Sequence, residues 1–277
     1  MQVQKFCDKL VLTDVKNFKA KDILECGQIF RFAKCKDGHY MVFSLDKKAD
    51  IFEYENKIEV VTKDVDYFEN FFDLQKDYSV YFDKYAKYDF FEKAYHHGQG
   101  IRILNQDLAE MIFSFIISAN NNIKRIQQII ERICNAIGDD MGGYHAFPTI
   151  EQMASVDEQF FKDMGAGYRA GYLVDTAKKL KEGFDLKALA GMNRDDARKT
   201  LLSLKGVGPK VADCILLFGL KKTNSFPVDT WTEKVYHAYF ENGLKNREDI
   251  AKFFVNLFGD DAGYVQQYLF YYQRENF

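Results

Sequence analysis

The sequence predicts an α+β fold in which an N-terminal antiparallel sheet precedes a mainly helical region. Short β-branched and aromatic segments follow one another closely before residue 64, and helical spacing of apolar residues begins after it. The three prolines, at positions 148, 209 and 227, each stand near an expected helix start. The 277 residues suffice for one large domain or two modest ones.

The sheet is expected within an N-terminal domain over residues 1–100, together with flanking helices. Strands are predicted at 39–45, 50–55 and 57–62, with a fourth across 27–33, which makes a meander of three or four strands. Asp37-Gly38 stands before the first of these and suits a type I′ hairpin.

The helical domain is expected over residues 101–277. Three pairs of residues resemble helix N-caps with their partners, namely Asp107 with Glu110, Thr149 with Gln152, and Asn193 with Asp196. The first opens an apolar helix, which three asparagines at 120–122 break before a second helix over 123–136. A helix–hairpin–helix is predicted at 193–218, and mostly helix from there to Phe277.

Composition limits the possible function classes. The chain is 47% hydrophobic and 29% charged, as in globular proteins, and its formal charge of −3 argues against an extended phosphate-binding surface. Its five cysteines are scattered and never spaced CxxC, which argues against an iron–sulfur cluster or a disulfide framework. No leader and no 18-residue apolar run is present, so a soluble protein of a reducing compartment is expected.

The segment at 201–219 reads LLSLKGVGPKVADCILLFG and carries the strongest local signal. Gly206 and Gly208 can form a tight turn, and Pro209 suits the first position of the next helix. Backbone N–H groups at such a turn form an anion site that fits one nucleic-acid phosphate. The turn alone is equally compatible with a DNA-binding helix–hairpin–helix and with a simple αα-corner.

Lys210 favours the DNA-binding interpretation. A cation in the first turn of a helix opposes the helix dipole, which should lower the pKa of its amine, and a neutral amine can form a Schiff base. The alternative is an ordinary surface lysine. Asp229 could be an ordinary helix N-cap, or a carboxylate that also stabilises a cationic sugar-like transition state.

The run LKGVGPKVADCILLFG followed by PVDTW resembles the helix–hairpin–helix, Gly/Pro-rich, invariant-Asp (HhH-GPD) superfamily of DNA glycosylases, and within it the 8-oxoguanine DNA glycosylases. The resemblance covers nearly the whole chain. It implies that the N-terminal sheet is similar to that of the TATA-box-binding protein. It also implies that Lys210 attacks the sugar C1′ and that Asp229 stabilises the transition state.

The resemblance assigns a base pocket and a cation site. Gly27 matches the glycine whose carbonyl accepts the N7–H of 8-oxoguanine, Cys214 and Phe270 match the residues that sandwich the base, and Gln266 matches the reader of its pairing edge. The carbonyls of Leu202, Leu204 and Val207 match positions that bind Na⁺ or K⁺ beside a phosphate. No cofactor is expected to be required, and no iron–sulfur cluster is expected.

The strand opposite the lesion has its own expected contacts. Asn120 matches the residue that fills the vacated stack, Arg125 and Arg169 match the arginines that recognise the orphaned cytosine, and Tyr168 matches the wedge that kinks the duplex. Trp231 departs from the pattern, because it stands where eukaryotic members of the family carry a histidine that contacts phosphate.

The expected activity is therefore excision of 8-oxoguanine opposite cytosine through a Lys210 Schiff base, followed by β-elimination of the abasic strand. The expected partner is double-stranded DNA, with no membrane contact and a monomeric state. The expected location is intracellular, cytoplasmic and nucleoid-associated in a bacterium or nuclear in a eukaryote. Two alternatives stay open: a monofunctional alkylated-base glycosylase and a non-catalytic DNA-binding module.

Overall fold

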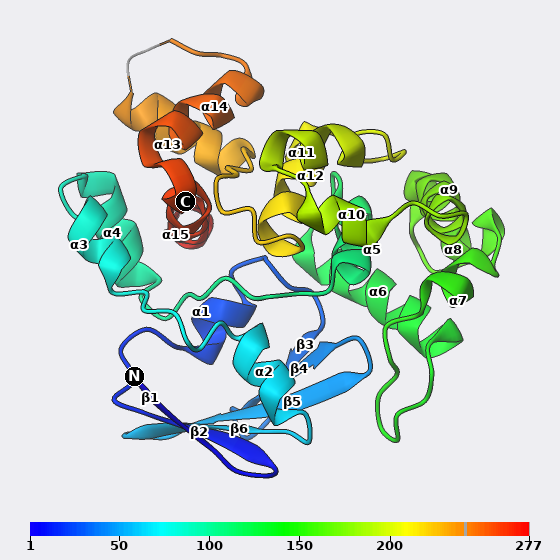
Figure 1. Cartoon of the computed structure of the whole chain (residues 1–277), viewed down its shortest axis with the longest axis horizontal. Helices are drawn as coiled ribbons and strands as arrows, with labels where there is room; N and C mark the ends of the chain where they lie inside the picture. Colours follow the sequence, from blue (N-terminus) through cyan, green and yellow to red (C-terminus); the bar gives the residue numbers. More distant parts are fainter. Residues whose placement is uncertain (241–242, 277) are drawn as a thin grey trace. The chain divides into compact units, whose positions relative to one another are not determined.

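The computed structural model describes residues 1–240 and 243–276, which form two compact units (Figure 1). The sheet unit comprises Met1–Val42, Lys48–Asn105 and Lys221–Phe277, and the hairpin unit comprises Phe43–Lys47 and Gln106–Leu220. None of the described helices is both long enough and apolar enough to cross a bilayer.

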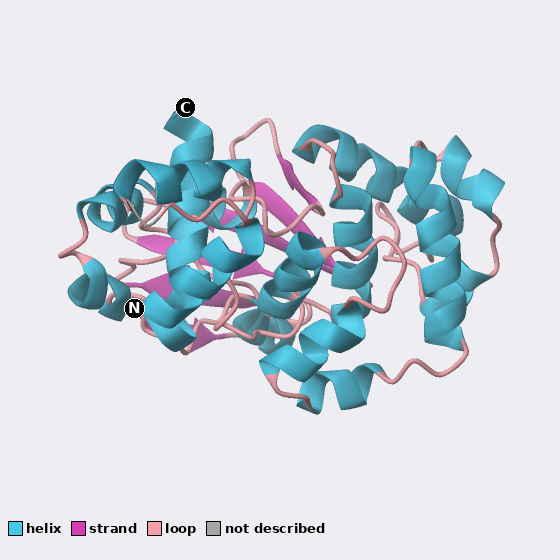
Figure 2. Cartoon of the chain, turned by 90° about the horizontal axis from the view of Figure 1, so that it is seen from above, coloured by secondary structure: helices cyan, strands magenta, loops and turns pink. Residues whose placement is uncertain are grey.

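A six-stranded antiparallel sheet runs in the order β1-β2-β6-β5-β4-β3. Figure 2 draws its strands in magenta. Its strands are β1 (Gln2–Lys5), β2 (Lys9–Thr13), β3 (Phe32–Lys34), β4 (Tyr40–Ser44), β5 (Lys47–Glu53) and β6 (Lys57–Val61). The α+β class is confirmed, but the expected three or four strands were too few, because β1 and β2 were missed. The strand expected over 27–33 is also wrong, since β3 begins only at Phe32.

The hairpin between β3 and β4 is not of type I′. That turn requires positive φ at both central residues, and here Gly38 alone has it, at +95°. The Cys35 N–H donates to the His39 carbonyl and the Gly38 N–H donates to the Cys35 carbonyl. These contacts fit a three-residue loop that ends in a left-handed glycine.

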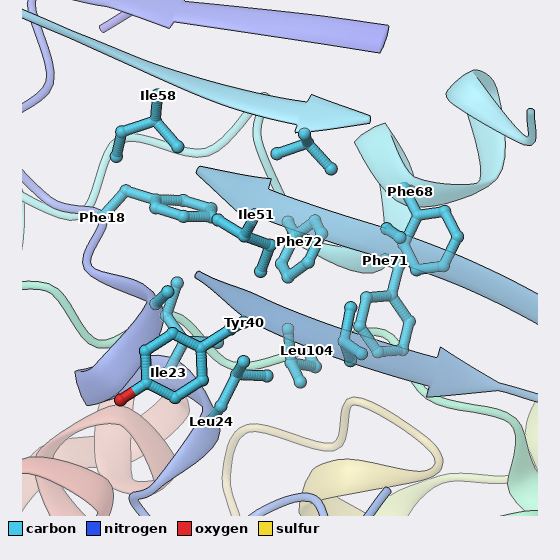
Figure 3. Packing of buried hydrophobic residues seen from close by; sticks show 14 of the residues in the cluster. Phe18, Ile23, Leu24, Tyr40, Ile51, Ile58, Phe68, Phe71, Phe72 and Leu104 are labelled. Atoms are coloured by element: carbon cyan, nitrogen blue, oxygen red, sulfur yellow. The ribbon is translucent and has the colours of Figure 1, made fainter. Parts of the chain in front are cut away.

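The core of the sheet unit lies on one face of the sheet (Figure 3). Alternate residues of the strands point into it, including Leu10 and Leu12 of β2 and Ile58 and Val60 of β6. Two helices cover this face, namely α1 (Ala20–Leu24) and α2 (Val65–Phe71), and the second contributes Phe68. This packing fixes α1 and the turn that follows it at Glu25–Gln28.

The other helices of the sheet unit are α3 (Val80–Tyr85), α4 (Asp89–His97), α13 (Thr230–Tyr239), α14 (Arg247–Phe258), the 3-10 turn η2 (Gly259–Asp261) and α15 (Ala262–Asn276). Helix α15 packs against α4 and α13, and its tyrosines contact aromatic rings of α3 and α4. Tyr81 stacks on Tyr264 at 4.4 Å between ring centroids, and Phe91 meets Tyr268 edge-on at 5.6 Å. The C-terminal helices thus belong to the same unit as the sheet, whereas the sequence had suggested a helical domain from 101 to 277.

The hairpin unit is helical. It contains α5 (Leu108–Ser118), α6 (Ile123–Ile137), α7 (Ile150–Ala154), α8 (Glu158–Asp163), η1 (Gly167–Arg169), α9 (Ala170–Lys181), α10 (Leu186–Gly191), α11 (Arg194–Leu201) and α12 (Pro209–Phe218). The predicted caps are present: Asp107, Thr149 and Asn193 each accept a backbone N–H three residues ahead, and Thr149 with Gln152 forms a complete capping box.

Candidate active site and nucleic-acid interface

Helices α11 and α12 and the turn at 202–208 form the predicted helix–hairpin–helix within the hairpin unit. Gly206 has a φ of +82°, and a Cβ there would lie 2.5 Å from the ring of Tyr172, so this position requires glycine. Gly208 is the N-cap of α12, has open space around it, and donates its N–H to no described residue. A phosphate oxygen can therefore approach the start of α12 at Gly208.

A buried carboxylate joins the two helices of the hairpin. Asp213 of α12 is 2% exposed, and it accepts hydrogen bonds from Nε and Nη2 of Arg198 of α11 at 2.7 and 3.3 Å. Arg194 lies 3.5 Å from the same carboxylate. The ion pair holds α11 against α12 and so sets the geometry of the turn between them.

Lys210 occupies the second position of α12 and is exposed. Its amine lies 5.8 Å from the centre of the Phe115 ring, which stacks on Phe218 at 5.6 Å. Cys214 lies one turn further along and is 3% exposed. The amine therefore stands at the positive end of a helix dipole against an apolar aromatic wall, and it remains accessible to a substrate.

The carbonyls expected to hold a monovalent cation lie in the same turn. Apart from hydrogen bonds within the helices, the carbonyls of Leu202 and Val207 accept none from the backbone N–H groups that the structure describes. The Leu204 carbonyl accepts one, from the Val207 N–H at 3.2 Å. Each carbonyl oxygen has two lone pairs, so all three retain capacity for a ligand. Neutral oxygen donors suit a hard cation such as Na⁺ or K⁺.

In the sheet unit, Asp229 is the N-cap of α13. Its Oδ1 accepts hydrogen bonds from the N–H groups of Trp231 and Thr232, both at 3.0 Å, and from the Thr232 hydroxyl at 3.1 Å. Its Oδ2 accepts none from any described residue, and the side chain is half-buried. The capping interpretation is confirmed, and it leaves one oxygen of a firmly held carboxylate available for chemistry.

Gly27, Phe270 and Gln266 lie in the sheet unit as well. Gly27 has a φ of +84°, and a Cβ there would lie 3.0 Å from the Phe270 ring. Its carbonyl accepts no hydrogen bond from a described residue. Gln266 is 4% exposed and donates to the Pro227 carbonyl at 3.3 Å, while its Oε1 has no partner. This region thus offers two unused carbonyl acceptors and one aromatic face.

The residues expected to contact the opposite strand meet in the hairpin unit, around the loop between α5 and α6. Asn120 is exposed with a φ of +49°. The Tyr168 hydroxyl donates to the Ala119 carbonyl at 3.2 Å, and Arg125 donates to the Gly165 carbonyl at 3.3 Å. Tyr168 is 58% exposed, as a wedge would have to be.

Arg169 differs from its expected presentation. It is 3% exposed, and its guanidinium donates to the carbonyls of Ala119, Asn120 and Ala166. In the structure, the Arg169 side chain thus holds the backbone of the loop at Asn120. Contact with a cytosine would require some of these hydrogen bonds to break.

The predicted residues divide between the two units. Gly27, Asp229, Gln266 and Phe270 lie in the sheet unit; the hairpin unit contains Lys210, Cys214, the hairpin carbonyls and the four residues around Asn120. Sequence reasoning missed Gln267 and Arg274, whose side chains bind backbone carbonyls at Cys26 and Glu25. Their spacing from Phe270 on one helix is the signal that could have found them.

Metal-binding groups are sparse in the described part of the chain. Cys35, Asp37 and His39 form one group whose ligand atoms lie within 4.8 Å of one another, on the β3–β4 hairpin. The five cysteines are free thiols.

Two family models match the chain. The model for the N-terminal domain of 8-oxoguanine DNA glycosylase matches residues 10–112, and the model for the HhH-GPD superfamily of base excision DNA repair proteins matches residues 113–258. Together they account for both the sheet and the helix–hairpin–helix.

Curated relatives agree with these models. The chain is 34% identical to the "Probable N-glycosylase/DNA lyase" of Methanothermobacter thermautotrophicus over 74% of this chain and 72% of that protein. It is 40% identical to the N-glycosylase/DNA lyase of Saccharomyces cerevisiae over 50% of this chain and 41% of that protein. The match thus spans less than half of the yeast relative.

A solved structure matches over almost the full length. It is the Clostridium acetobutylicum 8-oxoguanine glycosylase/lyase in complex with double-stranded DNA containing cytosine opposite 8-oxoguanine. The TM-score is 0.93 and the sequence identity 34%, with 100% of this chain and 98% of that chain covered. The chain belongs to the HhH-GPD superfamily of base excision DNA repair proteins, and within it to the 8-oxoguanine DNA glycosylase/lyases.

Proposed function

We propose that this protein excises 8-oxoguanine paired with cytosine from double-stranded DNA and then cleaves the abasic strand. The names of the relatives, which include N-glycosylase/DNA lyase and 8-oxoguanine glycosylase/lyase, support both activities. The observation that carries the substrate assignment is the unbonded Gly27 carbonyl beside the Phe270 ring.

Lesion recognition follows from the chemistry of the purine N7 atom. Guanine has a lone pair at N7, whereas 8-oxoguanine has an N7–H. A carbonyl held in place at Gly27 accepts that hydrogen from the lesion but opposes the lone pair of guanine, and buried groups left unpaired are costly. The free Oε1 of Gln266 suits the donors on the pairing edge of guanine.

Lys210 supplies the nucleophile in this proposal. Its neutral amine forms a bond to C1′, the C1′–N9 bond breaks with its electron pair going to the base, and the base gains a proton. The base takes this proton from the amine nitrogen. The C1′–O4′ bond then breaks, O4′ keeps its electron pair and gains a proton from water, and a Schiff base forms between Lys210 and C1′. Loss of a proton from C2′ then expels the 3′ phosphate. The free Oδ2 of Asp229 offers negative charge to the cationic sugar.

The opposite strand is assigned to the loop at Asn120. We propose that Asn120 fills the gap left by the extruded base, that Tyr168 enters the stack, and that Arg125 and Arg169 recognise the unpaired cytosine. Base extrusion costs roughly a few kcal/mol, and filling the gap offsets part of that cost. The exposure of Asn120 and Tyr168 on one loop region supports this assignment.

The hairpin turn is assigned to one phosphate of the bound strand. We propose that the carbonyls of Leu202, Leu204 and Val207 hold Na⁺ or K⁺, whose charge would attract the phosphate next to the Gly208 N–H. No other cofactor is needed for the chemistry proposed, and the protein is proposed to act as a monomer.

Borohydride trapping tests the central chemistry. The protein is incubated with an 8-oxoguanine:cytosine duplex in the presence of a chelator and borohydride, which reduces the Schiff base to a stable amine. The wild type should give a covalent complex, Lys210→Gln none, and Lys187→Gln, a control at an exposed lysine of α10, a normal yield.

Other outcomes of this experiment, together with parallel assays on alkylated and otherwise damaged duplexes, would identify other functions. A wild type that gives no covalent complex, or a Lys210→Gln variant that traps equally well, would overturn the Lys210 assignment. Release of 3-methyladenine without strand cleavage would indicate a monofunctional alkylated-base glycosylase. Retained DNA binding without release of any damaged base would indicate a non-catalytic module.

A further inference from the structure

The turn at Glu25–Gln28 is held from two sides, while the one carbonyl that the proposed function requires stays unbonded. The Gly27 carbonyl has no partner among the described residues. The carbonyls of Glu25 and Cys26 each accept a hydrogen bond from a side chain of α15. Side chains 241 and 249 residues away in the sequence thus fix the backbone just before Gly27.

Gln267 makes the first of these contacts. Its Nε2 donates to the Cys26 carbonyl at 2.7 Å, and the side chain is 1% exposed. That carbonyl belongs to the peptide plane that joins Cys26 to Gly27, so the hydrogen bond restrains the rotation about the N–Cα bond of Gly27. A hydrogen bond this deeply buried is costly to break, because the freed groups have no water to replace it.

Arg274 makes the second contact, two turns further along the same helix. Its Nη2 donates to the Glu25 carbonyl, and its guanidinium lies 5.5 Å from the centre of the Phe270 ring. Its Nη1 would lie 3.3 Å from a Cβ at Gly27 and is buried without a hydrogen-bond partner. Gln267, Phe270 and Arg274 have the spacing i, i+3 and i+7, so one helical face reaches the whole turn.

Gln28 secures the other end of the turn. Its fully buried side chain donates to the carbonyls of Ile23 at 3.0 Å and Arg102 at 2.7 Å, and it accepts the Leu104 N–H at 2.9 Å. The peptide that carries the Gly27 carbonyl therefore lies between a fixed plane before it and an anchored side chain after it.

Such bracing matters because the residue in the middle is glycine. Glycine has more backbone freedom than any other residue, and an unrestrained carbonyl there would sample many directions. When the acceptor carbonyl is mobile, ordering it on binding costs entropy and weakens the affinity for the base. A carbonyl that is already held in its binding direction avoids this cost. The discrimination between an N7–H and an N7 lone pair depends on that fixed direction.

We propose that Gln267 and Arg274 are positioning residues that aim the Gly27 carbonyl at N7 of the extruded base, and so set the selectivity for 8-oxoguanine over guanine. This inference rests on the proposed function. Adjacent glutamines then divide the work: Gln266 presents an unbonded oxygen to the pairing edge, and Gln267 fixes the turn.

The test measures selectivity separately from chemistry. Gln267→Met and Arg274→Met are made in a Lys210→Gln background, which does not turn over. Dissociation constants are measured for two duplexes that differ only in carrying 8-oxoguanine or guanine opposite cytosine. Each variant should reduce the ratio of the two constants about tenfold, the value of roughly one hydrogen bond. Arg274→Lys, which keeps one donor, should recover part of the ratio.

Strand cleavage at a preformed abasic site is measured with the same substitutions in the protein that retains Lys210. This reaction requires the Lys210 amine but no base pocket. The cleavage rate should stay within about twofold of the wild-type rate, a difference of about 0.4 kcal/mol. A rate that close to wild type excludes misfolding as the cause of the lost selectivity. Gln273→Met, on the same helix and outside these contacts, is the matched control and should change neither quantity.

The outcomes separate this inference from the proposed function. A Lys210→Gln parent that binds 8-oxoguanine and guanine duplexes equally would overturn the proposed function. If this parent discriminates while Gln267→Met and Arg274→Met in the same background discriminate equally well, only the positioning role is overturned. A parallel loss of abasic-site cleavage in both variants would show a structural role instead and would also overturn it.

Discussion

At the scale of single residues, Gly27 combines a backbone conformation that favours glycine with the proposed contact to the damaged base. We predict that Gly27→Ala lowers the rate of 8-oxoguanine excision about a hundredfold while cleavage at a preformed abasic site is retained. A φ of +84° strains alanine by about 1–2 kcal/mol, and the new methyl would press on the Phe270 ring at 3.0 Å. Single-turnover rates on the two substrates measure the effect.

Gly38→Ala provides the control for backbone strain. Gly38 has a similar φ of +95°, but a Cβ there meets nothing within 4 Å. Its substitution should lower stability and leave excision unchanged. Equal rates for Gly27→Ala and the wild type, or equal losses at both glycines, would contradict the assignment of Gly27 to the base pocket.

The role of a single residue could be predicted from the sequence where it depends on neighbouring residues in the chain. Lys210 and Asp229 could be placed at helix starts from the sequence, because the turn chemistry around them is contiguous. Gln267 could not be separated from Gln266, since their roles differ only in which neighbour each side chain meets in the folded unit. The burial of Arg169 against the carbonyls at 119–120 could not be predicted from the sequence either.

At the scale of elements, the hairpin depends on the ion pair between α11 and α12. We predict that Arg198→Met lowers the free energy of unfolding by about 3 kcal/mol, because it leaves the Asp213 carboxylate buried without its main partner. Asp213 is 2% exposed and lies 2.7 Å from Arg198 Nε. Urea denaturation of the full chain measures the change.

Arg194→Met is the matched control for that substitution. Arg194 approaches Asp213 only to 3.5 Å and also pairs with Asp195 at 2.7 Å, where the carboxylate is largely exposed. We expect a cost of about 1 kcal/mol or less, as for a weak ion pair. Equal destabilisation by the two arginine substitutions would show that Asp213 does not hold the helices together through Arg198.

Predictability at this scale followed the strength of local periodicity. The hairpin expected at 193–218 contains α11 and α12 as predicted, because caps, glycines and a proline mark its boundaries. The strands β1 and β2 were missed: β1 is a short edge strand whose residues are mostly exposed, so it has no strong apolar alternation. It pairs with β2 as a local hairpin, and this hairpin joins the sheet only through the pairing of β2 with β6, as of Leu10 with Val60, which is a long-range contact.

At the scale of the whole molecule, the class of fold could be predicted from the sequence, but the division of the core between the two units could not. The helices after Lys221 belong with the sheet because their aromatic side chains pack on α3 and α4, as Tyr264 does on Tyr81. Helical periodicity shows which face of each helix is apolar, but it does not show which partner that face meets. The boundary expected at residue 100 follows the change in local pattern, whereas the two compact units interleave along the chain.

Net charge is a property of the whole chain that bears on DNA binding. With a charge of −3, the protein should bind undamaged duplex through few ionic contacts, and backbone N–H groups at the hairpin should contribute the rest. Neutralising no more than about four phosphates gives a slope shallower than about −4 for log affinity against log salt. Titrations of a lesion-free duplex at several salt concentrations measure it. A slope of about −8 or steeper would reveal an extended cationic surface and contradict this expectation.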